Sequence, residues 1–177
     1  MNSAIPIIRN NGEGERRWFY GGGVHTWKAS AGETAGALML FEDQMSQGKA
    51  TPLHTHNEDE ALYVLEGELV VHVDGKNHRV GQYGFAFAPR GVPHAFLVTS
   101  PQARLLCWQT PASAEAFYRD ASELAGPATD PDGPVDFARV IAAAKQTGGM
   151  QVLGPPPFGE PQGTPSAPAL AGSDHGT

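Results

Sequence analysis

The sequence predicts an all-β domain, a sandwich or barrel of antiparallel strands, from three observations. Between about Trp18 and Pro111, short runs of β-favouring residues alternate with Gly, Pro, Asp and Asn. The 22 glycines and 15 prolines among 177 residues favour many turns. Two dipeptides, Asp74-Gly75 and Glu66-Gly67, separate such runs, and glycine supplies the positive φ that tight hairpins need. Strands at this close spacing are typical of antiparallel sheets.

Eight runs are expected to form strands, at residues 24–29, 37–45, 60–66, 68–74, 77–81, 84–91, 94–100 and 103–110. In the run 68–74, Leu69, Val71 and Val73 share one face, as they would in a half-buried strand. The two dipeptides predict that run 68–74 lies beside the runs before and after it in one antiparallel sheet.

The barrel is expected to span residues 17–112, with different structure on either side. Residues 1–16 are polar and predict an N-terminal arm. Residues 113–153 predict two short C-terminal helices and a closing segment. Ser113 is expected to cap a helix over 114–126, and a second helix fits 136–149. Residues 154–177 are rich in Pro, Gly, Ser and Ala and predict a disordered tail.

Composition argues against several kinds of partner. Twelve basic and nineteen acidic residues give a formal net charge of -7 without a basic cluster, so neither nucleic acid nor a membrane surface is expected to bind. No apolar run is long enough for a signal peptide or a membrane span. The single Cys107 lies in an apolar run and predicts a buried, inert thiol. We therefore expect a cytoplasmic protein.

His54 and His56 are two positions apart, and in an extended segment their side chains point the same way. Glu60 follows after a bend, where its carboxylate could approach the same ion. Glu58 and Asp59 are alternatives, but acidic residues in a loop are usually solvated, which favours Glu60. Imidazole and carboxylate ligands suit divalent Fe, Mn, Co, Ni, Cu or Zn and do not select among them.

The spacing around these histidines follows a recognisable pattern, with successive gaps of five, one, three and six residues between Gly48, His54, His56, Glu60 and Gly67. A second group has gaps of one and two residues between Pro89, Gly91 and His94. The chain resembles the cupin superfamily, which carries both motifs. Val98 stands where that family usually has asparagine, and Gly84 is one residue too close to the proline. The resemblance implies a jelly-roll barrel that holds one divalent transition metal per chain through His54, His56, Glu60 and His94.

Residues 18–157 are similar to small bacterial quercetin 2,3-dioxygenase-like cupins, notably over 21–45, 84–96 and 152–157. The likeness implies a metal-dependent dioxygenase that cleaves a flavonol or a similar enolisable aromatic substrate with dioxygen. Glu60 would then be both a metal ligand and the catalytic general base. Apolar residues are expected to line the substrate pocket, namely Met39, Phe41, Leu62, Phe87 and Phe96.

Two other functions remain open, because one barrel can serve several chemistries. An oxygen-independent, metal-dependent isomerase or cyclase of a biosynthetic pathway would use the same ion as a Lewis acid. In a small-ligand-binding cupin, the metal ion would stabilise the structure and would not catalyse a reaction. A small molecule is the expected partner in all three cases. Many cupins dimerise, so the N-terminal arm and the helices predict a homodimer.

Overall fold

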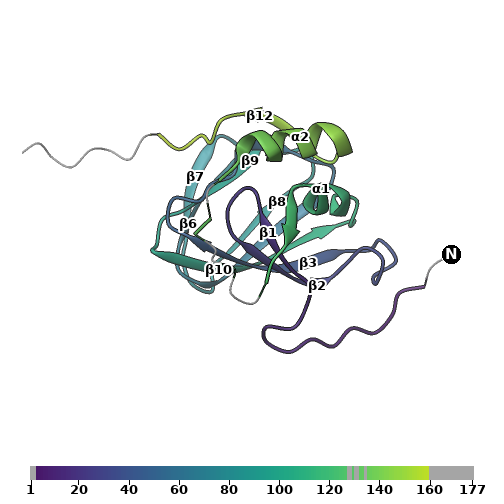
Figure 1. Ribbon diagram of the computed structural model, residues 1–177. Coiled ribbons are helices and arrows are strands. Elements are labelled where there is room, and N and C mark those ends of the chain that lie inside the picture. Colours follow the sequence, from purple (N-terminus) through teal and green to yellow (C-terminus); the bar gives the residue numbers. More distant parts are fainter. Residues whose placement is uncertain (1–2, 127–128, 130–131, 134, 160–177) are drawn as a thin grey trace, which may run out of the picture.

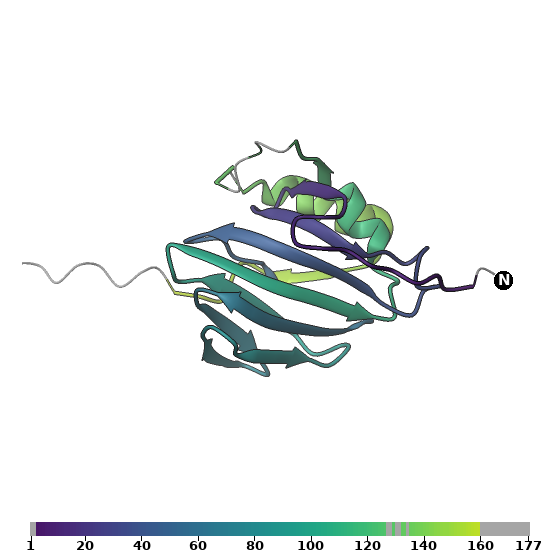
Figure 2. The ribbon, with the colours of Figure 1, turned by 90° about the horizontal axis from the view of Figure 1, so that it is seen from below.

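The computed structural model describes residues 3–126, 129, 132–133 and 135–159, which form a β-barrel of two antiparallel sheets (Figures 1 and 2). The larger sheet has the order β11 (Ser122–Leu124), β1 (Arg16–Phe19), β2 (Val24–Ala29), β3 (Met39–Ser46), β10 (Gln102–Thr110), β5 (Asp59–Glu66) and β8 (Phe85–Ala88). The smaller sheet has the order β12 (Gln151–Gly154), β4 (Leu53–Thr55), β9 (His94–Val98), β6 (Leu69–Val73) and β7 (Lys76–Val80).

The predicted all-β class is confirmed, and the eight expected strands form as β2, β3 and β5 to β10. The hairpin at Asp74-Gly75 is also confirmed, since Val73 pairs with Lys76 across it. Both turn residues have positive φ, 50° and 74°, as a two-residue hairpin turn with matching twist requires.

The hairpin predicted at Glu66-Gly67 is wrong. Strand β5 pairs with β10 and β8, whereas β6 pairs with β9 and β7, so the chain passes here from one sheet to the other. Gly67 has a φ of 82°, and a Cβ at this position would lie 2.2 Å from the carbonyl oxygen of Gln102. Glycine is therefore needed at this corner, but for its positive φ and the close approach of the β10 backbone rather than for a hairpin.

The first helix is shorter than predicted. Helix α1 (Glu115–Asp120) ends because Ser122–Leu124 leaves the helical path and pairs with β1 as strand β11. Ser113 does not cap this helix, since its hydroxyl donates to the carboxylate of Glu58 instead. Helix α2 (Phe137–Thr147) forms as expected, capped by Asp136 and ended by Gly148 in the left-handed conformation.

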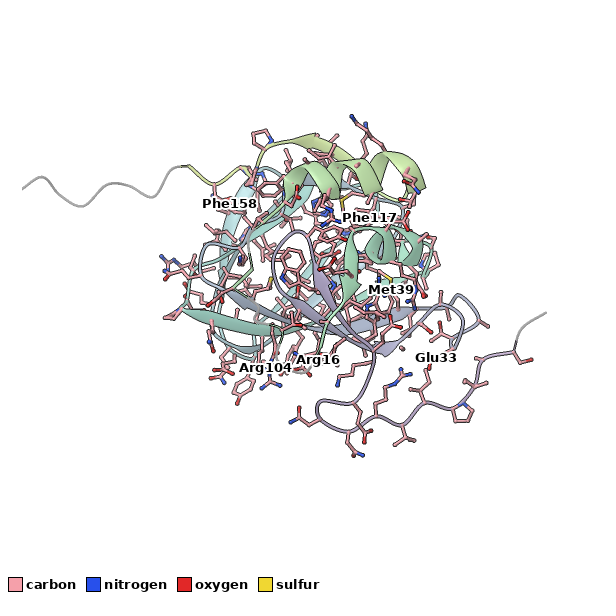
Figure 3. The ribbon with its side chains drawn as sticks, in the orientation of Figure 1. Arg16, Glu33, Met39, Arg104, Phe117 and Phe158 are labelled. Carbon is pink, nitrogen blue, oxygen red and sulfur yellow. The ribbon has the colours of Figure 1, made fainter. Side chains whose placement is uncertain are left out.

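Both ends of the described chain bond to the rest of the protein. Strand β12 adds to the edge of β4, in a segment for which no strand was expected. The N-terminal segment runs along the outside (Figures 1 and 2), where Arg9 binds the carboxylate of Glu33, labelled in Figure 3. Of the predicted disordered tail, residues 160–177 lie outside the described part. No helix in the described ranges has the length and apolarity to cross a membrane.

The two sheets enclose an apolar core whose inward positions follow the strand period of two. On β3 the buried side chains alternate with half-buried ones, so Met39, Phe41, Asp43 and Met45 all point inward. Several polar side chains are nevertheless buried with them, among them His25, Asp43, His54, His56, Glu58, Glu60, His94 and Gln109. Buried polar groups need partners, and these groups define the candidate site.

Candidate metal centre

Three histidines meet inside the barrel. His54 lies on β4 and pairs across the sheet with His94 on β9, while His56 follows directly after β4. The ring centroid of His94 is 4.3 Å from that of His54 and 4.8 Å from that of His56. One nitrogen from each ring lies within 4.8 Å of the other two, and all three residues are buried. This arrangement could hold one metal ion.

Backbone carbonyls determine which nitrogen of each ring faces the centre. The Nδ1 atoms of His54 and His94 lie 2.8 Å from the carbonyls of Pro52 and Val92, each two residues earlier in the chain. The Nδ1 atom of His56 lies 3.0 Å from the carbonyl of Glu58. A carbonyl oxygen only accepts, so each Nδ1 carries a proton and each Nε2 is left as the ligand atom. The Nε2 of His94 is buried without a hydrogen-bond partner within the described residues, as an ion-binding atom would be.

Glu60 on β5 brings a carboxylate to the same place. Its oxygens lie 3.3 Å from Nε2 of His56 and 3.7 Å from Nε2 of His94. Burial opposes ionisation of Glu60, but the hydrogen bond with His56 and the nearby histidine charges outweigh it and hold the pKa of Glu60 below its usual range. Three imidazoles and one carboxylate form a donor set that fits a divalent transition metal.

The pKa values of His54 and His56 are consistent with a cation site. Burial lowers the pKa of His54 to about 3, and the neighbouring His94 adds to this effect. Burial also acts to lower the pKa of His56, but hydrogen bonds to Glu58 and Glu60 raise it to about 10. The cluster thus attracts positive charge, which a proton on His56 supplies in the metal-free protein. A divalent ion can replace that proton, so metal binding would release it.

Gln109 and Tyr118 hold the Glu60 carboxylate in place. Gln109 is fully buried on β10, directly opposite Glu60 in the register with β5. Its amide donates to Oε2 of Glu60 at 2.5 Å and to the Tyr118 hydroxyl at 3.1 Å. Sequence reasoning missed both residues. The available signal was a glutamine in the inward row of β10, where Ala103, Leu105 and Cys107 precede it.

The other two acids of this loop lie elsewhere. The carboxylate of Glu58 is buried, but it contacts the Nδ1 side of His56 at 3.3 Å and the hydroxyl of Ser113. Asp59 forms a surface ion pair with Arg90 at 2.7 Å. Of the three acids considered from the sequence, Glu60 is therefore the one whose carboxylate contacts the Nε2 atoms.

A mostly apolar cavity opens beside the histidines, and His54 and Glu60 form part of its wall. Of the five residues expected to line a pocket, Phe41, Leu62 and Phe96 line this cavity. Phe87 is half exposed and lines a smaller neighbouring hollow with His94 and Glu60. Met39 is fully buried in the core and is not part of either wall.

The fold and the site together define a β-barrel with a candidate centre for one divalent metal ion. Residues 41–108 match the family model of the cupin domain, which supports the predicted resemblance to the cupin superfamily over that segment. The predicted resemblance is thereby confirmed at the level of the superfamily.

The chain is also similar to individual proteins and solved structures. Quercetin 2,3-dioxygenase of Bacillus subtilis (strain 168) is 29% identical over 115 residues, which cover 64% of this chain and 34% of the relative. The chain thus spans about a third of the length of that curated relative. An RmlC-like cupin from Shewanella frigidimarina has the same fold, with a TM-score of 0.55 and 22% identity over 63% of this chain and 96% of the other. A predicted oxalate decarboxylase from Thermotoga maritima has a TM-score of 0.54 and 21% identity, over 60% of this chain and 99% of the other.

Proposed function

We propose that this protein is a metal-dependent dioxygenase that cleaves a flavonol or a similar enolisable aromatic substrate with dioxygen. In this proposal His54, His56, Glu60 and His94 hold the metal. The supporting observation is that three Nε2 atoms and one buried carboxylate converge at the wall of an apolar cavity. The similarity to quercetin 2,3-dioxygenase supports the reaction class.

The bound ion would supply a Lewis acid for an enolic or phenolic hydroxyl of the substrate. The chain's own groups would bind and orient that substrate. Phe41, Leu62 and Phe96 offer apolar surface for flat rings and exclude water from the reacting end. Glu60 is ionised and lies at the cavity wall, so its carboxylate can accept the proton of the hydroxyl as general base. Gln109 keeps that carboxylate oriented.

Oxygen consumption tests the proposal directly. Protein is reconstituted separately with iron, manganese, cobalt and nickel, and quercetin is added while oxygen uptake and flavonol absorbance are followed. We expect uptake in proportion to the flavonol lost with at least one metal. If fully loaded protein consumes no oxygen with any of these metals, the proposal is refuted for this substrate, and the oxygen-independent isomerase or cyclase becomes the better interpretation.

Glu60→Gln tests the role of the carboxylate. The variant keeps the side chain's size and one ligand oxygen, so we expect it to retain some metal, measured by elemental analysis. Turnover should fall by about a hundredfold or more, because general base catalysis contributes about that much. Asp59→Asn is a matched control, since it alters the preceding residue, whose carboxylate binds Arg90 at the surface. Unchanged turnover in Glu60→Gln would rule out the proposed base.

The homodimer and the cytoplasmic location stay predictions. Sedimentation velocity tests the first, and a monodisperse monomer would contradict it. Cell fractionation tests the second.

A further inference from the structure

A second buried polar pair lies in the wall of the same cavity. His25 on β2 and Asp43 on β3 are cross-strand partners, and Nε2 of His25 lies 3.2 Å from Oδ2 of Asp43. The residues are only 2% and 5% exposed, and both line the cavity that His54 and Glu60 also reach. The proposed dioxygenase centre assigns no role to this pair.

Aromatic rings determine how His25 can interact. Its imidazole stacks on Phe19 at a centroid distance of 4.7 Å and on Phe41 at 4.3 Å, with interplanar angles of 21° and 14°. Ring stacking covers the faces of the imidazole, so only its edge is available for hydrogen bonds. One edge nitrogen, Nε2, is engaged by Asp43, and no hydrogen bond of Nδ1 is found within the described ranges.

One atom of this pair is left without a hydrogen-bond partner. The N–H of an imidazole donates and a carboxylate oxygen accepts, so the proton between the two residues lies on Nε2 of His25. The other oxygen of the carboxylate, Oδ1 of Asp43, is buried and has no partner in the described part of the chain. This unsatisfied acceptor calls for a donor, because a buried polar atom without a partner is costly.

The strand register separates this pair from the histidine cluster. Asp43 lies opposite Leu105 of β10, whereas Glu60 lies opposite Gln109, four residues further along the same strand. Four residues correspond to roughly 13 Å of extended chain. The cavity therefore has two ends. His54 and Glu60 form the metal-binding end, and His25 and Asp43 form an acceptor end, where a hydrogen bond can be accepted. Apolar side chains that include Phe41 and Leu62 lie between them.

We propose that His25 and Asp43 bind a hydroxyl group of the substrate, remote from the end that binds the metal. This inference rests on the proposed function, because it treats the cavity as the substrate site. The preferred substrate is then an aromatic molecule with a chelating end and a second hydroxyl on its far side. The pair selects among substrates and takes no part in the reaction.

Two small fluorinated probes test the acceptor end without requiring turnover. Dissociation constants of 4-fluorophenol and 4-fluorotoluene are measured by fluorine NMR on the full-length chain stripped of metal, because a bound ion could itself bind the phenol hydroxyl. The two probes differ in the hydroxyl that the pair should bind. We expect the phenol to bind roughly tenfold more tightly, as a hydrogen bond to a charged group allows.

The double variant His25→Phe/Asp43→Leu should abolish that preference. Both residues are replaced together, because removing one alone would leave a buried polar group unpaired. Phenylalanine also keeps the stacking on Phe19. Glu42→Gln is the matched control: it alters the preceding residue of β3, which faces outward and binds Arg104, and it should leave the preference unchanged.

Equal affinity for the two probes in the natural protein, or a preference that persists in the double variant, would overturn the inference. If circular dichroism shows that the double variant is unfolded, Asp43→Asn replaces it. The preference should then fall, since a neutral amide accepts a weaker hydrogen bond than a carboxylate, and an undiminished preference would overturn the inference equally. Absence of oxygen uptake with quercetin, together with a phenol preference that depends on the pair, would refute the proposed reaction and leave the hydroxyl site standing.

Discussion

Gln109→Leu tests how the candidate metal centre is oriented. Leucine has a similar size and removes the bonds that the amide donates to Oε2 of Glu60 and to the hydroxyl of Tyr118, together with its 3.5 Å contact with Nε2 of His56. Glu60 would regain rotational freedom that it must lose again when an ion binds. A hydrogen bond to a charged group stabilises by about 1.5–3 kcal/mol, and groups that orient metal ligands typically change metal affinity by about 10- to 100-fold. We expect a loss of zinc affinity in that range.

Competition with a chromophoric zinc chelator measures this loss. Tyr118→Phe is the matched control, because it removes the hydroxyl that accepts the second amide hydrogen but leaves the bond between Gln109 and Glu60. Its effect on zinc affinity should be the smaller of the two. If folded Gln109→Leu binds zinc within about twofold of the natural protein, Glu60 needs no such support, and the proposed orienting role is refuted.

Three further predictions concern single groups. His54→Ala and His94→Ala should each lower metal occupancy in equilibrium dialysis, and full retention in both would remove these residues from the ligand set. Cys107→Ser should lower the free energy of unfolding by about 1–3 kcal/mol, because it buries a hydroxyl, yet leave turnover unchanged; burial raises the pKa of the Cys107 thiol, so the folded protein should also resist alkylation. Arg9 and Ser30 hold the pKa of Glu33 at about 2, below the ordinary 4.5. Stability from Glu33 is therefore present above pH 4.5 and lost towards pH 2. Denaturant titrations should show Glu33→Gln less stable by roughly 1 kcal/mol near neutral pH, with most of this difference gone at pH 2; an undiminished difference there would contradict this.

The strands and the histidine cluster could be predicted because their signals are local. Alternation within each run marks a strand, and the i, i+2 spacing of His54 and His56 places two imidazoles together. His94 lies far along the sequence, and it was recognised by the resemblance to a family motif. The structure places it opposite His54.

Other features depend on which strands become neighbours, which local patterns do not specify. The turn chemistry of Glu66-Gly67 suits a hairpin and a corner between sheets equally, so the pairing of β5 was predicted wrongly. Ser113 has the right chemistry for a helix cap, but folding brings Glu58 within reach of its hydroxyl. Gln109 reaches Glu60 only through the register of β10 with β5.

Strand β12 has a consequence for the order of events during synthesis. His54 lies on a strand of three residues, which has β9 on one side and β12 on the other, with Val152 opposite His54. Chains leave the ribosome N-terminus first, so all three histidines emerge before the residues that complete the sheet around one of them. A nascent chain that stops before Gln151 would have every candidate ligand but only half of the support for β4. We therefore expect stable metal binding only after β12 has paired with β4. A protein with bound metal would then be one whose barrel is complete.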